Sequence, residues 1–508
     1  MNSKERFESS LRLIVKSSIF VLFGLILSKL FTYGNKVILA KYFGPETYGL
    51  FSLATMILLL FIYLFAFGLP EGILRFSALY KGRNQTYKTK YILKFLLIFL
   101  FFSGLLGSLA LFYLSSSISN SIFHNQNLIP YLRGFSIIIP FYICLNVFLS
   151  LLRSYQKIGH YSFLLNIFQP GLNITFLIIF IIIGYHNPII LAYILSIFIA
   201  FLTALLICRK ILFKEFERKT LTNKVKKESI LDLFSYSWPL VFSAMLANLF
   251  SWMDSFFVGY FKTVTDVGYY NVATTLSNLF SLTPAILMSI FYPLAIREFA
   301  KNRIGLIKDI SEHLTKWILI VNLPLFIIVV LFPGAIINLL FGSAYLVAEN
   351  ALRILAVGAL VMSILTISVD LISMKGKSKT ILINIIIVSI VNLILNFILV
   401  PRYGIDGAAV SASISLIILG TVLTFESRRF LSIFPFNKSR MFRILLVSIV
   451  SSLVLIFTRN ILSKSLISLF LQGAFFLLVY FGLILMSGTL DKNDYQIIKL
   501  IINKIRRK

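Results

Sequence analysis

The sequence has 508 residues, of which 58% are hydrophobic and only 13% are charged, and its mean hydropathy is +0.92. This composition excludes a soluble globular protein of this length and predicts an all-α integral membrane protein. The formal net charge of +29 does not indicate nucleic-acid binding, because the basic residues form no single patch with interleaved aromatic residues.

Apolar segments recur along the whole chain. A helix needs about 20 apolar residues to cross the hydrocarbon core of a bilayer. The sequence predicts about fourteen such transmembrane helices, at 16–40, 48–68, 91–114, 128–152, 161–184, 188–208, 234–258, 269–292, 314–333, 350–372, 378–399, 407–425, 442–458 and 466–487.

The basic residues indicate the topology. Most of the 48 Lys and Arg fall in alternate loops, whereas the segments 115–127 and 185–188 contain none. By the positive-inside rule, both termini of this multi-pass protein are expected in the cytoplasm and the chain in the cytoplasmic membrane. The first span is too long for a signal peptide and lacks a small-residue cleavage site, so we expect it to be retained.

An internal repeat relates the two halves of the chain. With a shift of 218 residues the segment 36–43 aligns with 254–261, and a loop one residue longer then aligns 48–52 with 267–271. Far downstream the same shift relates Lys157 to Lys375 and Asn166 to Asn384. Chance similarity between apolar helices is the alternative. Because each unit holds six spans, the sequence predicts two six-helix lobes in a parallel repeat around a central cavity.

These spans and the repeat give the expected domain organisation. Two segments, the linker between the lobes and the tail, combine basic and apolar residues, which is typical of helices on an anionic membrane surface; a solvated basic segment is the alternative. The predicted parts are an N-lobe at 1–208, a basic cytoplasmic linker at 209–233, a C-lobe at 234–425, a cytoplasmic loop at 426–441, two extra C-terminal helices at 442–487 and a basic amphipathic cytoplasmic tail at 488–508.

Three of the charged residues in predicted spans lie in the first span of each half. An ionised side chain at the centre of a bilayer costs about 2.5–3.5 kcal/mol even on the most lenient scale, so it usually faces protein or a water-filled cavity. Lys29 lies near the middle of the first span, and Lys36 lies two turns later on nearly the same face. The repeat places Asp254 at the position of Lys36. We expect all three in the cavity, and Lys36 and Asp254 are candidates for a pair; contacts within each lobe or with headgroups are the alternative.

Further charges lie near the ends of equivalent spans. Arg133 and Arg353 occur just inside the outer ends of spans four and ten, where they are candidates to attract an anionic group of the substrate or to anchor the helices at the interface. Arg153 and Asp370 occur near the inner ends of the same spans and are candidates for a cytoplasmic gate. Arg75 begins a basic stretch that is a candidate entrance for a phosphate. The sum of these charges favours an anionic substrate.

The sequence shows no catalytic or metal-binding pattern. Cys144 and Cys208 lie at apolar positions, and the four histidines have no ligand spacing. No phosphate-binding loop of the Walker type is present. We therefore expect no enzyme activity, no metal site and no cofactor, which leaves transport, with a non-transporting membrane scaffold or receptor as a less favoured class.

Two stretches resemble a known family. They are 36–54, leading to Gly68 and Leu69, and 375–410, with Lys375-Gly-Lys377 and Pro401-Arg-Tyr-Gly-Ile-Asp-Gly-Ala-Ala-Val410. They are similar to the polysaccharide-transporter family of the multidrug/oligosaccharidyl-lipid/polysaccharide exporter superfamily, the Wzx-type flippases. Physically, Gly44-Pro45 and Gly49 allow a tight outer turn, while Gly404, Gly407, Ala408 and Ala409 allow a turn followed by close helix packing.

The resemblance implies a flippase that works by alternating access. Its substrate would be an oligosaccharide linked to a polyprenyl phosphate or pyrophosphate, and its partners would be membrane lipids and glycan-assembly machinery, with no nucleic acid. The coupling ion, H⁺ or Na⁺, is left open. A cation-coupled multidrug exporter and a lipid II flippase of the same superfamily are the alternatives.

Overall fold

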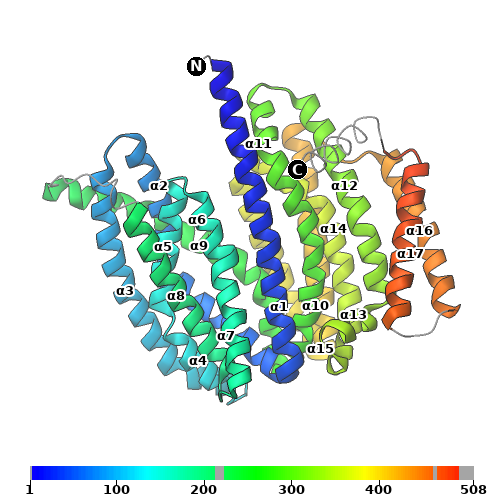
Figure 1. Cartoon of the computed structure of the whole chain (residues 1–508), viewed down its shortest axis with the longest axis horizontal. Helices are drawn as coiled ribbons and strands as arrows, with labels where there is room; N and C mark the ends of the chain where they lie inside the picture. Colours follow the sequence, from blue (N-terminus) through cyan, green and yellow to red (C-terminus); the bar gives the residue numbers. More distant parts are fainter. Residues whose placement is uncertain (1–2, 212–221, 462–465, 491–508) are drawn as a thin grey trace. The chain divides into compact units, whose positions relative to one another are not determined.

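The computed structural model describes residues 3–211, 222–461 and 466–490, and within these ranges the chain is helical and contains no strand. Figure 1 labels the helices in chain order. They are α1 (Ser3–Ala66), α2 (Leu69–Gly82), α3 (Thr86–Ser117), η1 (Ile118–Ile122), α4 (Leu128–Ser136), α5 (Ile139–Ser154), α6 (Ile158–Ser162), η2 (Phe163–Phe168), α7 (Gln169–Ile183), α8 (Pro188–Ile211), α9 (Asn223–Phe261), α10 (Val264–Ser277), η4 (Asn278–Ser281), α11 (Leu282–Ala300), α12 (Ile304–Leu331), α13 (Pro333–Leu340), η5 (Ser343–Ala348), α14 (Glu349–Met374), α15 (Ser378–Leu431), α16 (Lys438–Ile461) and α17 (Leu466–Met486).

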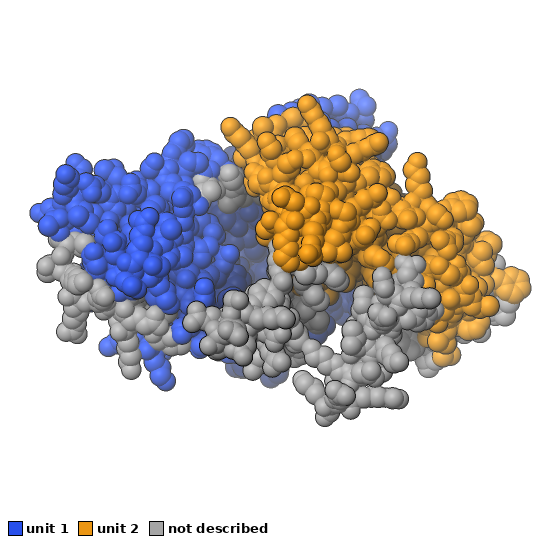
Figure 2. Space-filling view, turned by 90° about the horizontal axis from the view of Figure 1, so that it is seen from above, with its two compact units in different colours: residues 1–272, 340–348, 389–411 blue, residues 273–339, 349–388, 412–508 orange. Residues whose placement is uncertain are grey.

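The helices group into two compact units, which Figure 2 colours separately. Unit 1 comprises residues 1–272, 340–348 and 389–411, and unit 2 comprises residues 273–339, 349–388 and 412–508. Unit 2 includes α16 and α17, which pack against each other, and α16 also packs against α12. The lobe boundaries expected from the repeat do not coincide with these units and stay a prediction.

The all-α membrane architecture expected from composition is confirmed. Among the described residues, nine helices are long and apolar enough to cross a membrane, or ten if the pair α4 and α5, bent by 51°, forms one span. Every predicted span falls on a helix. Because α1 and α15 each contain two predicted spans, the count by helix is lower than the count by sequence, and the number fourteen stays a prediction.

Two glycines divide these long helices. Within α1 the backbone is non-helical at Gly44, with φ of 82°, and Pro45 follows it; within α15 it is non-helical at Gly404, with φ of 59°. Positive φ is readily accessible only to glycine, so these positions permit a reversal between consecutive spans. Both turns occur where the sequence placed them. The predicted close packing also occurs, because a Cβ on Gly407 would lie 2.4 Å from the carbonyl oxygen of Leu399.

One helix that the sequence did not predict is α2. It follows a break in which Phe67 and Gly68 both have positive φ, and Pro70 lies in its first turn, a position where proline is favoured. A Cβ on Gly72 would lie 2.1 Å from Ser237 Oγ, so glycine allows α2 to approach α9 closely. The predicted basic stretch therefore begins, at Arg75, on a helix and not in a loop.

The repeat-related glycines Gly49 and Gly268 form a reciprocal contact within unit 1. A Cβ on Gly49 would lie 1.9 Å from the carbonyl oxygen of Val264, and a Cβ on Gly268 would lie 2.1 Å from that of Pro45. A shift of 219 residues relates both pairs, Gly49 to Gly268 and Pro45 to Val264. Each glycine thus contacts, in the other repeat, the residue equivalent to the one that its own equivalent contacts. Two copies related by a two-fold axis contact each other in this way.

The predicted surface helices lie partly outside the described residues. Residues 212–221 of the linker and residues 491–508 of the tail fall there. In the remainder of the linker, α9 begins at Asn223 and continues into the seventh predicted span.

A buried asparagine joins three elements of unit 2. Asn322 on α12 donates to the carbonyl oxygen of Phe280 and to Ser363 Oγ, each at 2.9 Å, and accepts from Thr283 Oγ1 at 2.7 Å. Its side chain is fully buried. Replacing a buried partner leaves the remaining polar groups unsatisfied and creates a cavity.

We therefore expect Asn322→Ala to lower the free energy of unfolding by about 2–3 kcal/mol. Thermal unfolding in detergent would measure it. The matched control is Asn350→Ala on the exposed start of α14, where one bond of 3.0 Å to Arg353 is lost and the expected cost is under about 1 kcal/mol. Equal losses in the two variants would contradict the assignment of Asn322 to the core.

Candidate functional site

Unit 1 contains a pocket of about 250 Å³ between the second half of α1, α2, α5, α6, η2 and α9. Its walls combine aliphatic side chains with a concentration of polar groups. The polar side chains used below are Tyr63, Glu71, Tyr142, Asn146, Arg153 and Tyr161. Aromatic rings with hydroxyl groups, an amide and both charge types give the pocket an apolar surface with several hydrogen-bonding positions.

Arg153 is the cation of this pocket. It lies in the last turn of α5, where a cation also interacts favourably with the helix dipole. Its Nη1 lies 3.9 Å from Glu71 Oε1, and its guanidinium lies 5.4 Å from the ring centre of Tyr161. Both charged side chains are about half exposed, at 42% and 52%. An ion pair this long and this exposed contributes little to stability, so Arg153 is free to exchange Glu71 for another anion.

Arg75 lies outside this pocket. Its guanidinium is 4.0 Å from the ring centre of Tyr236 on α9 and 5.9 Å from that of Phe76. The contact ties α2 to α9, and a stacked arginine keeps its hydrogen-bond donors available at the ring edge.

The two lysines of the first span differ in exposure. Lys29 is exposed and Lys36 is half-buried, and Lys36 makes contacts of its own. The repeat-equivalent Asp254 is only 7% exposed. Its Oδ1 accepts hydrogen bonds from the amides of Asn392, at 3.1 Å, and Asn396, at 2.7 Å, on α15. Among the described residues these two amides donate to the carboxylate, and its pairing with Lys36 stays a prediction.

The neighbourhood of Asp254 retains an unused polar atom. Asn396 Oδ1 is buried and has no hydrogen-bond partner among the described residues. Asn392 and Asn396 are 1% and 0% exposed. A buried carboxylate thus lies in a polar cluster built from α9 and α15, all of it in unit 1.

This geometry predicts the outcome of a charge exchange. In the double variant Lys36→Asp with Asp254→Lys, the new lysine would meet two amide donors and lose the hydrogen bonds that Asp254 accepts. We expect no rescue of activity relative to the single variants, because the donors are left unpaired and a cation is buried among them. Transport assays of the three variants measure this; recovery in the double variant would show that the two charges pair in another conformation.

Local contacts hold the two arginines that the sequence predicts at the outer side. Arg133 Nε and Nη2 donate to Ser115 Oγ and Ser116 Oγ at 3.2 and 3.3 Å, and the guanidinium lies 5.1 Å from the ring centre of Phe112. In unit 2, Arg353 Nε donates to the carbonyl oxygen of Val330 at 3.2 Å, and Nη2 lies 3.6 Å from Glu349 Oε2. These contacts tie each arginine to the neighbouring helix end.

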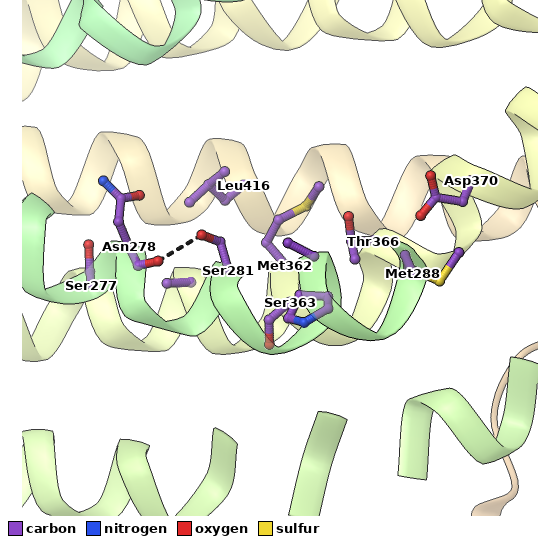
Figure 3. Close-up of a pocket in the computed structure, with 12 residues that line it drawn as sticks. Ser277, Asn278, Ser281, Met288, Met362, Ser363, Thr366, Asp370 and Leu416 are labelled. Atoms are coloured by element: carbon purple, nitrogen blue, oxygen red, sulfur yellow. Dashed lines mark hydrogen bonds between the residues drawn. The ribbon is translucent and has the colours of Figure 1, made fainter. Parts of the chain in front are cut away.

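Unit 2 contains a second pocket, of about 360 Å³, lined by residues of α10, η4, α11, α14 and α15. Figure 3 shows Asn278 and Ser281 at one end of this pocket and Asp370 at the other, with Met362 and Thr366 between them. Asp370 is half-buried. In the ranges that the structure describes, no protein group donates a hydrogen bond to its carboxylate.

Sequence reasoning identified the charges of these sites but missed most of their neighbours. The tyrosines of the unit 1 pocket and the asparagines around Asp254 were not singled out. Two asparagines four residues apart, Asn392 and Asn396, lie in an otherwise apolar span, and that spacing on one helix face was the available signal. Within the described ranges, no group of three or more His, Cys, Asp or Glu is placed to hold a metal ion.

Comparison with known proteins identifies the family. The family model described as polysaccharide biosynthesis protein matches residues 14–294, which is more than half of the chain. The chain belongs to the polysaccharide biosynthesis protein family. A second family model, described as MatE, matches residues 239–398. The resemblance found in the sequence is therefore confirmed.

Two of three curated relatives carry names that refer to a glycan or an O-antigen. A probable low-salt glycan biosynthesis flippase of Haloferax volcanii is 28% identical over 55% of this chain and 60% of its own length. A putative O-antigen transporter of Shigella flexneri is 23% identical over 83% of this chain and 99% of its own length. An uncharacterized membrane protein of Methanocaldococcus jannaschii is 27% identical over 55% of this chain and 54% of its own length. The chain thus spans little more than half the length of two of these relatives.

Solved structures share the fold. The lipid II flippase MurJ in an inward closed conformation matches with a TM-score of 0.72 at 18% identity, covering 92% of this chain and 98% of that one. A multidrug resistance MATE family transporter in an inward-facing conformation matches with a TM-score of 0.64 at 15% identity, covering 82% of this chain and 98% of that one. At these identities the likeness establishes only that the chain shares the all-α membrane fold of these proteins.

Proposed function

We propose that this protein is a flippase that moves a saccharide linked to a polyprenyl phosphate or pyrophosphate across the cytoplasmic membrane by alternating access, without enzymatic turnover. The observation that carries the proposal is the unit 1 pocket. It places the guanidinium of Arg153 beside tyrosine rings in a chain of the polysaccharide biosynthesis protein family.

The chemistry of this pocket fits the region where a sugar joins its phosphate. The planar guanidinium offers two parallel donors to phosphate oxygens. The tyrosine rings offer apolar faces to a sugar ring, and their hydroxyls together with Asn146 offer hydrogen bonds to its hydroxyl groups. Glu71, held loosely by Arg153 at 3.9 Å, is exchanged for the phosphate when substrate binds.

The charges on α1 extend this picture. Lys29, exposed in the first span, and Lys36 attract the pyrophosphate, while Arg75 on α2 receives it from the predicted cytoplasmic leaflet.

A coupling ion, H⁺ or Na⁺, completes the proposal: a gradient of that ion drives the conformational cycle. Both termini are cytoplasmic, and glycan-assembly enzymes supply the substrate and consume the product.

The test is flipping of a fluorescent polyprenyl-pyrophosphate trisaccharide in vesicles that contain the purified protein. The fraction of probe that reaches the opposite leaflet is measured with and without gradients of H⁺ and Na⁺, and protein-free vesicles are the control. Protein-dependent movement supports the proposal, and acceleration by one gradient identifies the ion.

Three outcomes would replace the proposal. Movement of lipid II but not of the trisaccharide lipids would assign the peptidoglycan precursor as the substrate. Export of an organic cation, together with no movement of either lipid, would assign a multidrug exporter. Binding of the lipids without any movement would indicate a scaffold or receptor.

A further inference from the structure

The two pockets occupy equivalent places in the two repeats. The lining residues of one pocket map onto those of the other by shifts of 219 and 217 residues, close to the 218 that relates the halves. The corresponding pairs are Leu59 and Asn278, Ile62 and Ser281, and Ala66 and Ala285 on the second span of each half, and Tyr142 and Ala359, Asn146 and Ser363, Leu149 and Thr366, and Arg153 and Asp370 on the fourth. The pockets are therefore two copies of one structural position.

Their chemistry has diverged in opposite directions. The unit 1 copy has a cation and aromatic rings where the unit 2 copy has the carboxylate of Asp370 and the small side chain of Ala359. Conversely, aliphatic side chains of unit 1 correspond to hydroxyl and amide groups in unit 2, at Asn278, Ser281 and Thr366. An anion that suits Arg153 would be repelled by Asp370, so the second pocket requires a different chemical group.

The unit 2 pocket is rich in hydrogen-bond acceptors. Ser281 Oγ donates its proton to the carbonyl oxygen of Asn278 at 2.7 Å, and Ser277 Oγ donates to that of Thr274 at 3.0 Å. Ser363 Oγ donates to the carbonyl oxygen of Leu360 at 2.7 Å. Their protons are used, and Ser363 Oγ also accepts from Asn322, so the oxygens of Ser277 and Ser281 and the carboxylate of Asp370 have mainly lone pairs to offer. A ligand with several hydroxyl donors complements them.

The shape of the pocket favours a ring over an ion. An ion needs several oxygens converging on one point. Here Asp370 lies at the opposite end from Asn278 and Ser281, with the apolar side chains of Met362 and Leu416 lining the space between (Figure 3). The volume of about 360 Å³ lies at the small end of the range for ligand pockets, which runs from ~300 to ~1,000 Å³. Polar edges and apolar walls match a single sugar ring, which has hydroxyls at its rim and C–H groups on its faces.

We propose that the unit 2 pocket is a saccharide subsite, in which Asp370 accepts hydrogen bonds from two hydroxyl groups of one sugar ring. This inference rests on the proposed function and assigns the sugar of that substrate to the unit 2 pocket by itself. Asp370 thus binds the sugar and not the lipid phosphate.

The test compares two lipids in the vesicle assay with the full-length protein. One is the polyprenyl-pyrophosphate trisaccharide, whose half-saturating concentration for flipping is measured. The other is polyprenyl pyrophosphate without sugar, whose inhibition constant against that flipping is measured. For Asp370→Asn we expect the half-saturating concentration to rise by roughly 10- to 100-fold, because charged acceptors of sugar hydroxyls are lost, while the inhibition constant changes less than about twofold.

Two further variants make the result specific. Asp309→Asn removes the same charge from an exposed position of α12 in the same unit and should leave both constants unchanged. Thr366→Val removes one hydroxyl of the pocket at nearly constant volume and should raise the half-saturating concentration of the trisaccharide lipid by roughly 3- to 10-fold. This variant tests the inference if Asp370→Asn fails to fold.

Several results would overturn the inference. They are equal changes for both lipids, no change in either pocket variant, or loss of the response to an ion gradient with the half-saturating concentration unchanged, which would assign Asp370 to ion coupling. Failure of the proposed function looks different, because the unaltered protein would then move no lipid at all, and the inference would fall with it.

Discussion

Replacement of Arg153 by glutamine is expected to slow flipping of a pyrophosphate-linked saccharide by roughly 10- to 100-fold, because a charge-assisted bidentate bond to phosphate is replaced by a neutral one. Stability should change little, since the pair of Arg153 with Glu71 is long and exposed. Initial flipping rates in vesicles, measured at equal protein content, provide the value.

The control is Arg209→Gln. Arg209 is an exposed arginine in the last turn of α8, in the same unit and on the same predicted cytoplasmic side. It lines neither pocket, so its loss removes the same charge without removing the contact. If both variants flipped the substrate at similar rates, Arg153 would not be the phosphate contact, and the unit 1 pocket would no longer support the proposed function.

Much of the fold was predictable because lipid imposes a simple rule. A backbone in hydrocarbon must satisfy its hydrogen bonds within the segment, so a sufficiently long apolar segment is a helix. The turns at Gly44 and Gly404 were also predictable. Each glycine lies near a proline between two predicted spans, and glycine readily adopts the positive φ that a tight turn requires. The helix α2 was not predicted, because its mixed sequence has no membrane signal and its position depends on contact with α9 through Gly72.

The candidate site was predictable only in part. A charge in an apolar span is visible in the sequence, which is why Lys29, Asp254, Arg153 and Asp370 could be named. Their neighbours depend on which helices pack together. Asn396 is distant from Asp254 in sequence, yet its amide lies 2.7 Å from the carboxylate. The equivalence of the two pockets was encoded in the 218-residue repeat, but only the lining residues reveal which positions to compare.

The contact between Gly49 and Gly268 leads to the second large effect. In Gly49→Ala the new methyl group would lie 1.9 Å from the backbone oxygen of Val264, a distance that no side-chain rotation can relieve. The second half of α1 and α10 must then move apart. If this contact closes the predicted outer side during alternating access, flipping should fall by at least about tenfold, and the strain should cost about 1–3 kcal/mol of stability.

A cysteine at position 40 reports whether the contact has opened. Ala40 is 1% exposed, and its carbonyl oxygen accepts a hydrogen bond from the hydroxyl of Tyr345 at 3.1 Å. In a background without Cys144 and Cys208, Ala40→Cys should resist a membrane-impermeant thiol reagent added from the predicted outer side, and Gly49→Ala should make it reactive. Gly482→Ala is the matched control, since a Cβ there meets nothing within 4 Å and the residue lies inside α17.

The combination of rate and labelling separates a gate from a structural contact. A gate variant loses flipping and gains labelling at Ala40→Cys while the protein remains folded, because the two sides of the contact are held apart without disruption of either. A purely structural contact would lose flipping only in proportion to lost folded protein. Normal flipping in Gly49→Ala, with Ala40→Cys still protected, would show that α1 and α10 tolerate the added methyl group and that their close approach is not required for transport.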